Sequence, residues 1–481
     1  MKHRLALELR RELEGTGAEI SYLGPENHHE NNKSWSDTCE KEAGAIVNVT
    51  STKDVSKTVT FARNHHIELV VKAGGHSTRT ESATRGGIVI SLSKMRNVYV
   101  DAKSQTVRVQ GGATWDDVNT ATASYGLAVV GDTASRTGVG GSTLGGGYGW
   151  LTGQHGLIVD SLISATVVLA NGSVLDASQD THKDLFWAIR GAGQAFGVVT
   201  ELVFKAYDMP NDIFGGLLYF TPHKLDRIVE FANWFDKQQN ERSGFFFGFR
   251  ALSPVEEALV MALVFYDGPK EEATSFFAPL LSLHASLGAV GMMSYTQLNR
   301  LGNIEPKPAG RKATSGTNIT FPLDKKLAHE LWAGFNQIME AYPEAGASVL
   351  AFELLPYTKV ISVPVTATAC ANRGRFYNVG LLLCWKSPER DAAMDQYRRA
   401  VVATIQYSQR RLNRGEHAVA YPNYSGRFGR LLKAAHRSLL AGHDFGSGSL
   451  FGTNLPRLQE LKKIYDQHNF FRKWHNLLKP Y

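Results

Sequence analysis

Two glycine-rich segments and one histidine are the residues whose types and spacing could do chemistry in this chain. Residues 70–77 form an apolar run that ends in two glycines directly before His76, and residues 138–149 contain seven glycines in twelve positions. Glycine removes side chains where a backbone approaches a ligand closely, and consecutive backbone N–H groups bind anions such as a pyrophosphate. These segments predict a site for a large phosphorylated cofactor, with the imidazole of His76 beside it.

The composition is that of an ordinary globular protein and limits the function classes. The chain has 481 residues, of which 43% are apolar and 20% charged. This length exceeds what one hydrophobic core usually serves, so we expect two domains or one domain with a large insertion. The 52 basic and 45 acidic residues give a mild net charge of +7. Because no nucleic-acid-binding motif accompanies this charge, we expect no nucleic-acid partner.

The N-terminus and the cysteines bear on where the protein works. Residues 1–15 are charged and helix-like without the apolar stretch of a signal peptide, and no apolar run has the length of a membrane span. We therefore expect a cytoplasmic protein without a membrane partner. The three cysteines, Cys39, Cys370 and Cys384, form no CxxC pair. This disfavours both a disulfide framework and a structural zinc site, and no metal is predicted.

Helix signals place two helices near the glycine-rich segments. A capping box at Ser51 and Asp54 predicts a helix that leads into the apolar strand before the first glycine pair. A second box at Thr114 and Asp117 predicts another helix before the second glycine-rich segment. A helix is thus expected before each segment, and before the first segment a strand follows that helix.

Strand signals favour an α+β fold. Two apolar runs flank Asn171-Gly172, a strong hairpin signal, and alternating runs predict strands at 88–90, 98–100 and 107–109. Neither the segment from Gly138 to Gly149 nor residues 191–197 has the GxGxxG spacing and the later acidic residue that a Rossmann unit requires. The order of elements predicts an α+β domain and excludes a Rossmann fold.

A second kind of region follows, in which glycine becomes rare. Helical patterns at 224–240 and 391–409 alternate with strand-like runs at 348–354 and 377–385. We interpret residues 213–418 as an inserted sheet with helices on one face. Because this region lacks a glycine cradle, we expect it to shape the substrate site.

Five motifs, in order along the chain, carry a resemblance to a known family. They are AGGHS at 73–77, TGVGGSTLGGGYGWLTGQHGL at 137–157, DLFWAIRGAGQAFGVVTEL at 184–202, YPNY at 421–424 and IYDQHNFF at 464–471. With these motifs the chain resembles the berberine-bridge-enzyme-like flavin oxidases, which belong to the superfamily with a vanillyl-alcohol-oxidase or PCMH-type FAD domain.

The resemblance implies a domain organisation. It implies a two-lobed FAD-binding domain over residues 1–208, whose PCMH-type part covers about 39–208, and an inserted substrate-binding domain over 209–417 with an antiparallel sheet covered by helices. The C-terminal segment, 418–481, is expected to complete the FAD-binding domain. FAD is expected between the two lobes with its isoalloxazine ring facing the inserted domain.

The resemblance also implies how the flavin is held. His76 matches the histidine that bonds to the 8α carbon of FAD, and a neutral imidazole is nucleophilic near pH 7. Many relatives add a cysteinyl bond, but Ala134 stands at that place, so we expect no cysteinyl link. The residues expected to bind FAD are Lys72, Gly74, Gly75, His76, Ser77, Thr78, Gly131, Thr137, Gly138, Gly141, Ser142, Gly145, Gly146, Gly147, Gly149, Trp150, Gly197, Val198, Asn423 and Tyr424.

Several residues are candidates for the catalytic base. Gly380 stands where several relatives carry a Glu, Gln or Asp on a strand, so the role passes to Tyr421, to Tyr424 or to a carboxylate on a neighbouring strand. The pKa of Tyr424, ordinarily near 10, would have to be lowered. Glu353 lies in an apolar run where burial would raise its pKa into a useful range. The alternative for Glu353 is an outward-facing place on a half-exposed strand.

Gly380 and Arg373 are the candidates for substrate contact. The glycine leaves room for a bulkier substrate. Arg373 either anchors an acidic or enolic substrate or forms a salt bridge beside a turn.

The resemblance implies an FAD-dependent oxidase. A base deprotonates the substrate, a hydride passes to flavin N5, and O2 reoxidises the flavin. We expect a hydroxylated small molecule of polyketide-like or aromatic type. The alternatives are a cyclase or pericyclase in which FAD is a wall of the pocket, which Gly380 favours, a carbohydrate or alcohol oxidase, and a flavin-binding protein without turnover.

Overall fold

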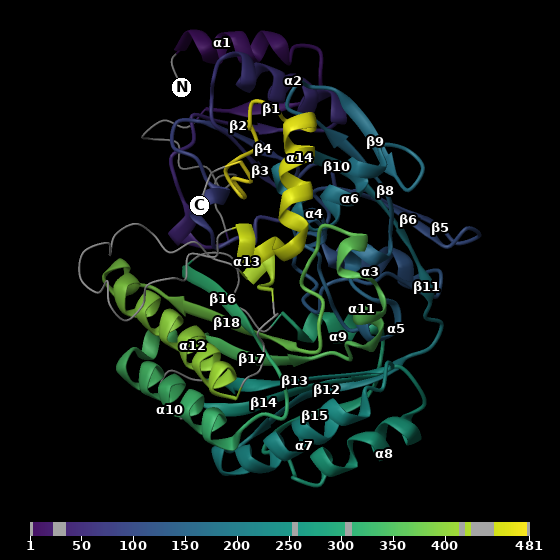
Figure 1. Ribbon diagram of the computed structural model, residues 1–481, viewed down its shortest axis with the longest axis vertical. Helices are drawn as coiled ribbons and strands as arrows, with labels where there is room; N and C mark the ends of the chain where they lie inside the picture. Colours follow the sequence, from purple (N-terminus) through teal and green to yellow (C-terminus); the bar gives the residue numbers. More distant parts are fainter. Residues whose placement is uncertain are drawn as a thin grey trace.

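Two parts stacked one above the other make up the molecule (Figure 1). The computed structural model describes residues 3–22, 35–252, 258–303, 310–412, 419–424 and 447–478. The upper part holds two smaller sheets, and the lower part holds one large sheet whose far face is covered by helices. Chain segments from both ends of the sequence meet in the upper part.

The first sheet has four strands in the order β1-β2-β4-β3, with β2, β4 and β3 parallel. Ser51 and Asp54 cap the helix that connects β2 to β3, which confirms the predicted capping box. The elements are α1 (His3–Glu12), β1 (Glu19–Ser21), β2 (Ala45–Asn48), α2 (Thr52–Asn64), β3 (Leu69–Lys72) and β4 (Ile88–Ser91).

The second sheet has five antiparallel strands in the order β5-β6-β10-β8-β9. Thr114 and Asp117 form the second predicted capping box, and Asn171-Gly172 connects β8 to β9 in the predicted hairpin, where Gly172 has a φ of +84°. The strands are β5 (Val98–Asp101), β6 (Thr106–Gln110), β8 (Leu162–Val168), β9 (Val174–Ser178) and β10 (Val198–Lys205), and β7 (Leu127–Ala128) pairs with β11 (Tyr207–Asp208). The helices are α3 (Trp115–Ala123), α4 (Val139–Leu144), α5 (Thr152–His155) and α6 (Lys183–Ala192).

The third sheet has seven antiparallel strands in the order β15-β12-β14-β13-β17-β18-β16. They are β12 (Ile213–Phe220), β13 (Ser243–Arg250), β14 (Leu259–Tyr266), β15 (Leu287–Met293), β16 (Arg311–Ile319), β17 (Val349–Leu354) and β18 (Tyr377–Trp385). Four helices, α7 (Leu225–Gln238), α8 (Lys270–Leu281), α10 (Lys325–Ala341) and α12 (Asp391–Arg411), cover its lower face (Figure 1).

Alternation along the central strand β13 explains the two faces of the large sheet. Phe245, Phe247 and Phe249 point into the core under the helices, whereas Phe246 points the other way and packs on Trp150, with ring centroids 4.6 Å apart. The upper face of the sheet therefore packs against the upper part of the molecule, and side chains on that face can contribute to a site between the parts.

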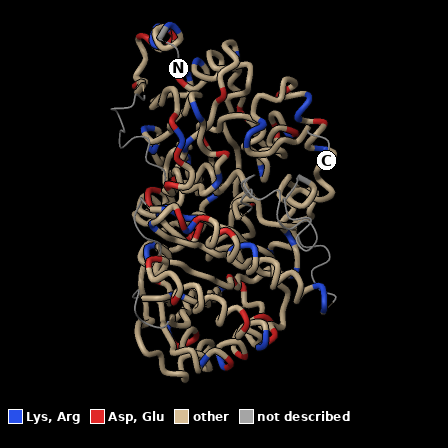
Figure 2. The backbone as a smooth tube through the Cα atoms, turned by 90° about the vertical axis from the view of Figure 1, so that its left-hand side faces the viewer, with Lys and Arg blue, Asp and Glu red and all other residues tan. Residues whose placement is uncertain are grey.

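Short elements connect the parts and close the chain. The helix α9 (Tyr295–Leu301) packs on α3 and α11 (Thr358–Ser362) on α5, while α13 (Ser447–Phe451) and α14 (Leu455–Tyr465) return to the upper part, where α14 contacts α6. Positive and negative residues occur in both parts (Figure 2). None of the helices that the structure describes combines the length and the apolarity needed to cross a membrane.

Candidate active site

A cavity of about 410 Å³ lies where the three sheets meet, and most of the residues predicted to bind the cofactor line it. Its wall combines the loop after β3, the start of α4, the start of β10, the upper face of the large sheet and the turn Pro422–Tyr424. The predicted residues in this wall are Lys72, Gly74, Gly75, His76, Ser77, Thr78, Thr137, Gly138, Gly141, Ser142, Gly197, Val198, Asn423 and Tyr424.

Glycines of the two sequence segments touch each other in the cavity wall. A Cβ on Gly138 would lie 2.6 Å from the Cα of Gly74, so neither backbone could approach the other with a side chain present. Gly75 has a φ of +74°, which favours glycine. A Cβ on Gly141 would meet no atom within 4 Å. Since Gly141 lines the cavity, that open space is available to a ligand that lies against the backbone.

Six of the residues predicted to contact the cofactor pack inside the protein and do not line this cavity. Gly147 has a φ of +69°, and a Cβ there would lie 2.8 Å from Cγ1 of Ile158; one on Gly146 would lie 2.7 Å from Sγ of Cys370. Trp150 is fully buried among aromatic rings. An added Cβ would clash at the three remaining glycines as well. It would meet Trp115 at Gly131, Asn423 at Gly145, and the backbone of Gly131 at Gly149.

His76 lines the cavity with its ring against an indole. The ring centroids of His76 and Trp35 are 4.9 Å apart with an interplanar angle of 16°. Burial, followed by the charges of Arg136 and Lys312, lowers the pKa of His76 to about 4. The imidazole is therefore neutral at pH 7, and a ring nitrogen keeps the lone pair that a nucleophile needs.

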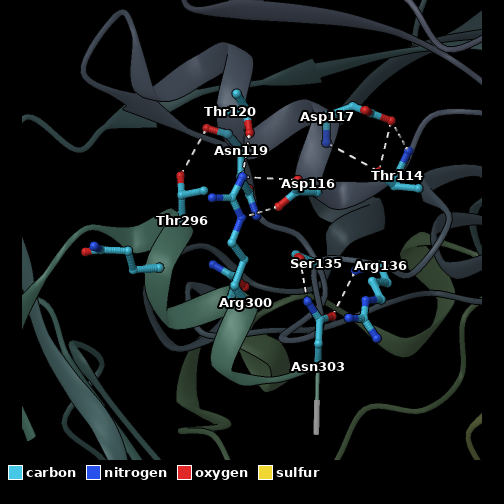
Figure 3. Close-up of polar contacts among 12 residues, drawn as sticks. Thr114, Asp116, Asp117, Asn119, Thr120, Ser135, Arg136, Thr296, Arg300 and Asn303 are labelled. Carbon is cyan, nitrogen blue, oxygen red and sulfur yellow. Dashed lines mark hydrogen bonds and ion pairs between the residues drawn. The ribbon is translucent and has the colours of Figure 1, made fainter. Parts of the chain in front are cut away.

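Ala134 lines the cavity. The residues that follow it, Ser135 and Arg136, are contacted by Asn303 (Figure 3). Asn303, just after α9, donates from Nδ2 to Oγ of Ser135 (2.9 Å) and accepts from the backbone N–H of Arg136 (3.1 Å). Arg300 on α9 forms an ion pair with Asp116 of α3, with its Nε 2.8 Å from a carboxylate oxygen. We call Arg300 and Asn303 the α9 clamp, since both fasten the upper part to the lower one.

Glu353 on β17 is a buried carboxylate in the cavity wall, so the outward-facing alternative does not hold. It accepts a hydrogen bond from Oη of Tyr424 (2.7 Å) and a second from Oη of Tyr148. Burial raises the pKa of Glu353 to about 7, although both hydrogen bonds act in the opposite direction. At neutral pH this carboxyl group can therefore take up or release a proton.

The tyrosines around Glu353 remain protonated. Burial, followed by the charge of Glu353, raises the pKa of Tyr424 above its ordinary value, and burial followed by the charge of Asp132 does so for Tyr421. Tyr424 therefore lacks the lowered pKa that it would need to act as the base. Its ring meets that of Tyr421 edge-on at 5.1 Å, and Nδ2 of Asn423 donates to Oη of Tyr421 (2.8 Å). These hydroxyl groups serve as hydrogen-bond donors and acceptors.

Tyr148 is a site residue that the sequence analysis missed. It lies in the glycine-rich segment, lines the cavity, and packs on Tyr421 with ring centroids 4.8 Å apart. The only signal in the sequence is that Tyr148 is the one aromatic residue among the glycines of residues 145–149.

Gly380 lines the cavity beside Glu353, whose carboxylate lies where a side chain at 380 would begin. It faces Ala351 across the β17–β18 ladder, and a Cβ on Gly380 would lie 3.1 Å from Oε1 of Glu353 and 3.3 Å from Oη of Tyr424. The carboxylate from the neighbouring strand thus occupies the space that a side chain at 380 would need. This corrects the expectation that Gly380 enlarges the site.

Arg373 forms a buried ion pair with Asp160, with N–O distances of 2.8 and 2.5 Å, and does not line the cavity. The prediction that it anchors a substrate is therefore wrong, and the salt-bridge alternative holds.

The large sheet gives the cavity an apolar wall with one ionisable group. Among the lining residues that the structure describes, Glu353 is the only acidic or basic side chain that this sheet contributes. The apolar members of the wall are Leu217, Phe246, Met261, Leu263, Val349, Ala351, Leu381 and Leu382. The arrangement can bind an apolar molecule and place one polar group of it at the carboxylate.

Known FAD-linked proteins are similar to this chain over nearly its whole length. Residues 43–178 match a family described as an FAD binding domain, and residues 443–477 match one described as berberine and berberine like. The chain is 33% identical to the FAD-linked oxidoreductase pgmH of Aspergillus terreus, over 97% of this chain and 94% of that protein.

Solved structures show the same fold. BBE-like 1 of Physcomitrella patens superposes with a TM-score of 0.82 at 19% identity, over 98% of this chain and 100% of that one. A xylooligosaccharide oxidase of Myceliophthora thermophila gives 0.80 at 20% identity over 99% of both chains. These likenesses confirm the α+β fold that the sequence predicts.

Proposed function

Because this chain belongs to the berberine-bridge-enzyme-like family of FAD-linked oxidoreductases, we propose that it oxidises a hydroxylated, largely apolar small molecule with O2 as electron acceptor. The observation that carries this proposal is the cavity with His76 in one wall and the Glu353 carboxylate in another. The apolar lining supports an aromatic or polyketide-like substrate over a sugar, whose many hydroxyl groups would lack partners there.

The residues present fit an FAD molecule. The touching glycines Gly74 and Gly138 and the open space at Gly141 form a backbone wall that a bulkier side chain would fill. We propose that FAD lies against this wall and is bonded to His76 alone, since Ala134 offers no thiol. We further propose domain bounds of 1–208 and 418–481 for the FAD-binding domain and 209–417 for the substrate-binding domain.

In the proposed mechanism the chain's own residues position the substrate and move its proton. Bound FAD supplies the hydride acceptor. Glu353 takes the proton from the substrate hydroxyl, while Tyr148 and Tyr424 donate the hydrogen bonds that orient the carboxylate. The apolar wall excludes water from the reacting groups. A pKa of about 7 suits Glu353 to act as a base near neutral pH.

Gly380 no longer favours the cyclase alternative. That alternative depended on Gly380 removing the base, whereas Glu353 from the next strand lies 3.1 Å from the Cβ position of residue 380. The geometry therefore supports the oxidase proposal.

An anaerobic substrate panel tests the proposal. Phenols, alcohols, sugars and polyketides would be mixed with the purified protein, and the visible absorbance of its flavin followed. We expect an apolar hydroxylated compound to bleach the flavin, and added air to restore the colour with formation of H2O2. Conversion of a compound without bleaching would indicate a cyclase, and bleaching by sugars alone would indicate a carbohydrate oxidase.

A further inference from the structure

A short N-terminal segment connects the His76 loop to the edge of the large sheet. The backbone N–H of Trp35 donates to the carbonyl of Gly75 (3.3 Å), and that of Asp37 donates to the carbonyl of Gly310 (3.1 Å). Oγ of Ser36 donates to the carbonyl of Lys312 on β16 (2.7 Å). We call residues 35–39 the strap. It spans the two parts of the molecule at the place where His76 enters the cavity wall.

The strap places one face of Trp35 on His76 and leaves the indole little freedom. The two rings are stacked at 4.9 Å and 16°. Nζ of Lys312 donates to the carbonyl of Trp35 (2.7 Å) and lies 5.1 Å from the centroid of its ring. Both side chains are buried, with 7% of Trp35 and 1% of Lys312 exposed. The buried ammonium of Lys312 thus holds Trp35 in place, and Trp35 in turn holds the imidazole of His76.

We propose that Trp35 and Lys312 are positioning residues that hold the His76 imidazole in the orientation required to bond to the 8α carbon of FAD. This inference rests on the proposed covalent link. In that step a ring nitrogen of His76 forms a C–N bond to the methyl carbon. The methyl carbon loses one hydrogen and the imidazole loses the N–H hydrogen of its other ring nitrogen. The flavin takes up both as two electrons and two protons, and O2 reoxidises it to give H2O2.

The geometry explains why both residues would be needed. A stacked indole fixes the plane of the imidazole, and a bond between pre-oriented groups forms faster than one between freely rotating groups. The positive charge of the Lys312 ammonium also disfavours protonation of the His76 imidazole. Together with burial and Arg136, it lowers the pKa of His76 and preserves the nucleophilic lone pair.

The test measures covalent flavin, not turnover. Trp35→Leu removes the aromatic face, Trp35→Phe keeps one, and Lys312→Met keeps the length of the side chain without its charge. Arg311→Met is the matched control, because Arg311 is the residue before Lys312 on β16 and its guanidinium pairs with Asp391 at 2.6 Å on the opposite side of the strand. Each purified variant is incubated with excess FAD, and the acid-stable and acid-released flavin are quantified over time, alongside thermal unfolding.

We expect covalent incorporation to slow at least tenfold in Trp35→Leu and Lys312→Met. Both variants should still bind FAD without a covalent bond, so that the FAD stays with the protein until acid is added. Trp35→Phe should stay within about threefold of wild type, and Arg311→Met should match wild type even if it melts earlier.

Three results have different meanings. Incorporation at the wild-type rate in both Trp35→Leu and Lys312→Met overturns the inference. Equal slowing in Arg311→Met also overturns it, because the effect would then follow stability alone. A wild-type protein that releases all of its flavin in acid refutes the proposed covalent link, a failure distinct from that of the strap.

Discussion

At the scale of single residues, the site depends on a carboxyl group held between opposing influences. Burial disfavours the charged form of Glu353, and the hydroxyl groups of Tyr148 and Tyr424 favour it. A pKa of about 7 results, so both protonation states are populated at neutral pH. The neighbouring tyrosines, whose pKa values are raised, cannot compete as bases under the same conditions.

Replacing Glu353 should remove most of the rate of flavin reduction. Glu353→Gln conserves shape but cannot accept the substrate proton, so stopped-flow reduction should slow by roughly 10² to 10⁴. In the wild type the base must be deprotonated, so the rate should be low at acidic pH and rise through a pKa of about 7 to a plateau. The variant should lack this rise. Reduction at the wild-type rate would transfer the role to another residue.

Replacing Tyr424 should shift the pH dependence while keeping the base. Tyr424→Phe removes a donor to the carboxylate, so the pKa of Glu353 should rise and the acidic limb of the profile should move to higher pH. On the plateau the rate should remain within about tenfold of wild type, because Glu353 still accepts the proton. A loss of roughly 10² or more at every pH would instead identify Tyr424 as the base.

The sequence predicted part of this site, and long-range contacts supplied the rest. Glu353 was identifiable as a carboxylate in an apolar run, and His76 by its two preceding glycines. Tyr148 was not, because its partner Glu353 is 205 positions away. Gly380 was misinterpreted for the same reason, since only the pairing of β17 with β18 shows which side chain occupies the space beside it.

At the scale of elements, the second glycine-rich segment has two different tasks. Gly138 and Gly141, at the start of α4, face the cavity. Gly146 and Gly147, after α4, have positive φ and pack against Cys370 and Ile158. The sequence shows glycine density but not the direction in which each missing side chain would point, so it could not separate glycines that line the cavity from glycines that pack inside the protein.

A pair of alanine substitutions should separate these tasks. Gly141→Ala adds a methyl group into open cavity space, so the protein should fold with wild-type stability and bind less flavin. Gly147→Ala forces a residue with a Cβ into left-handed backbone, which alone costs about 1–2 kcal/mol, and crowds Ile158. Denaturant unfolding and flavin-to-protein absorbance ratios measure the two effects. Full flavin content in Gly141→Ala would refute a ligand at that wall.

Within the α9 clamp, Asn303 should contribute more than Arg300 to the free energy of unfolding. Asn303→Ala deletes two hydrogen bonds to the loop that carries Ala134, at roughly 1–3 kcal/mol in total. Arg300→Met breaks an ion pair whose side chains are 53% and 38% exposed, and such pairs contribute about 0–1 kcal/mol. Urea unfolding of the two variants gives the order directly, and a larger loss in Arg300→Met would contradict it.

At the scale of the whole molecule, the cavity forms where segments that are distant in the sequence pack together. The strand β16 pairs with β18 although β17 lies between them in the sequence, and the turn Pro422–Tyr424 adds the tyrosines from the C-terminal side. Periodicity predicted most of these strands, but it carries no information on their order in the sheet. The order of the motifs along the chain indicated which segments belong together.

Near the C-terminal end of the chain, α14 packs beside α6 in the upper part (Figure 1). Nζ of Lys462 is fully buried, 2.7 Å from the carboxylate of Asp466 and 3.0 Å from the carbonyl of Phe471, and it also donates to the carbonyl of Ala195. Asp466 in turn accepts from the backbone N–H of Phe471 (2.8 Å). Because Phe471 and Trp474 line the cavity, this buried pair connects chain closure to the ligand site.

Breaking that pair should loosen the whole upper part. Asp466→Asn leaves the Lys462 ammonium buried without its counter-charge, and such losses cost about 3–5 kcal/mol. On the same helix Arg457 pairs with Asp184, and their side chains are 47% and 59% exposed, so Asp184→Asn should cost no more than about 1 kcal/mol. We expect Asp466→Asn to unfold at lower denaturant concentration and to expose its flavin to solvent earlier than Asp184→Asn does. Equal unfolding midpoints would show that the C-terminal segment is held by its apolar contacts, with the buried charges contributing nothing.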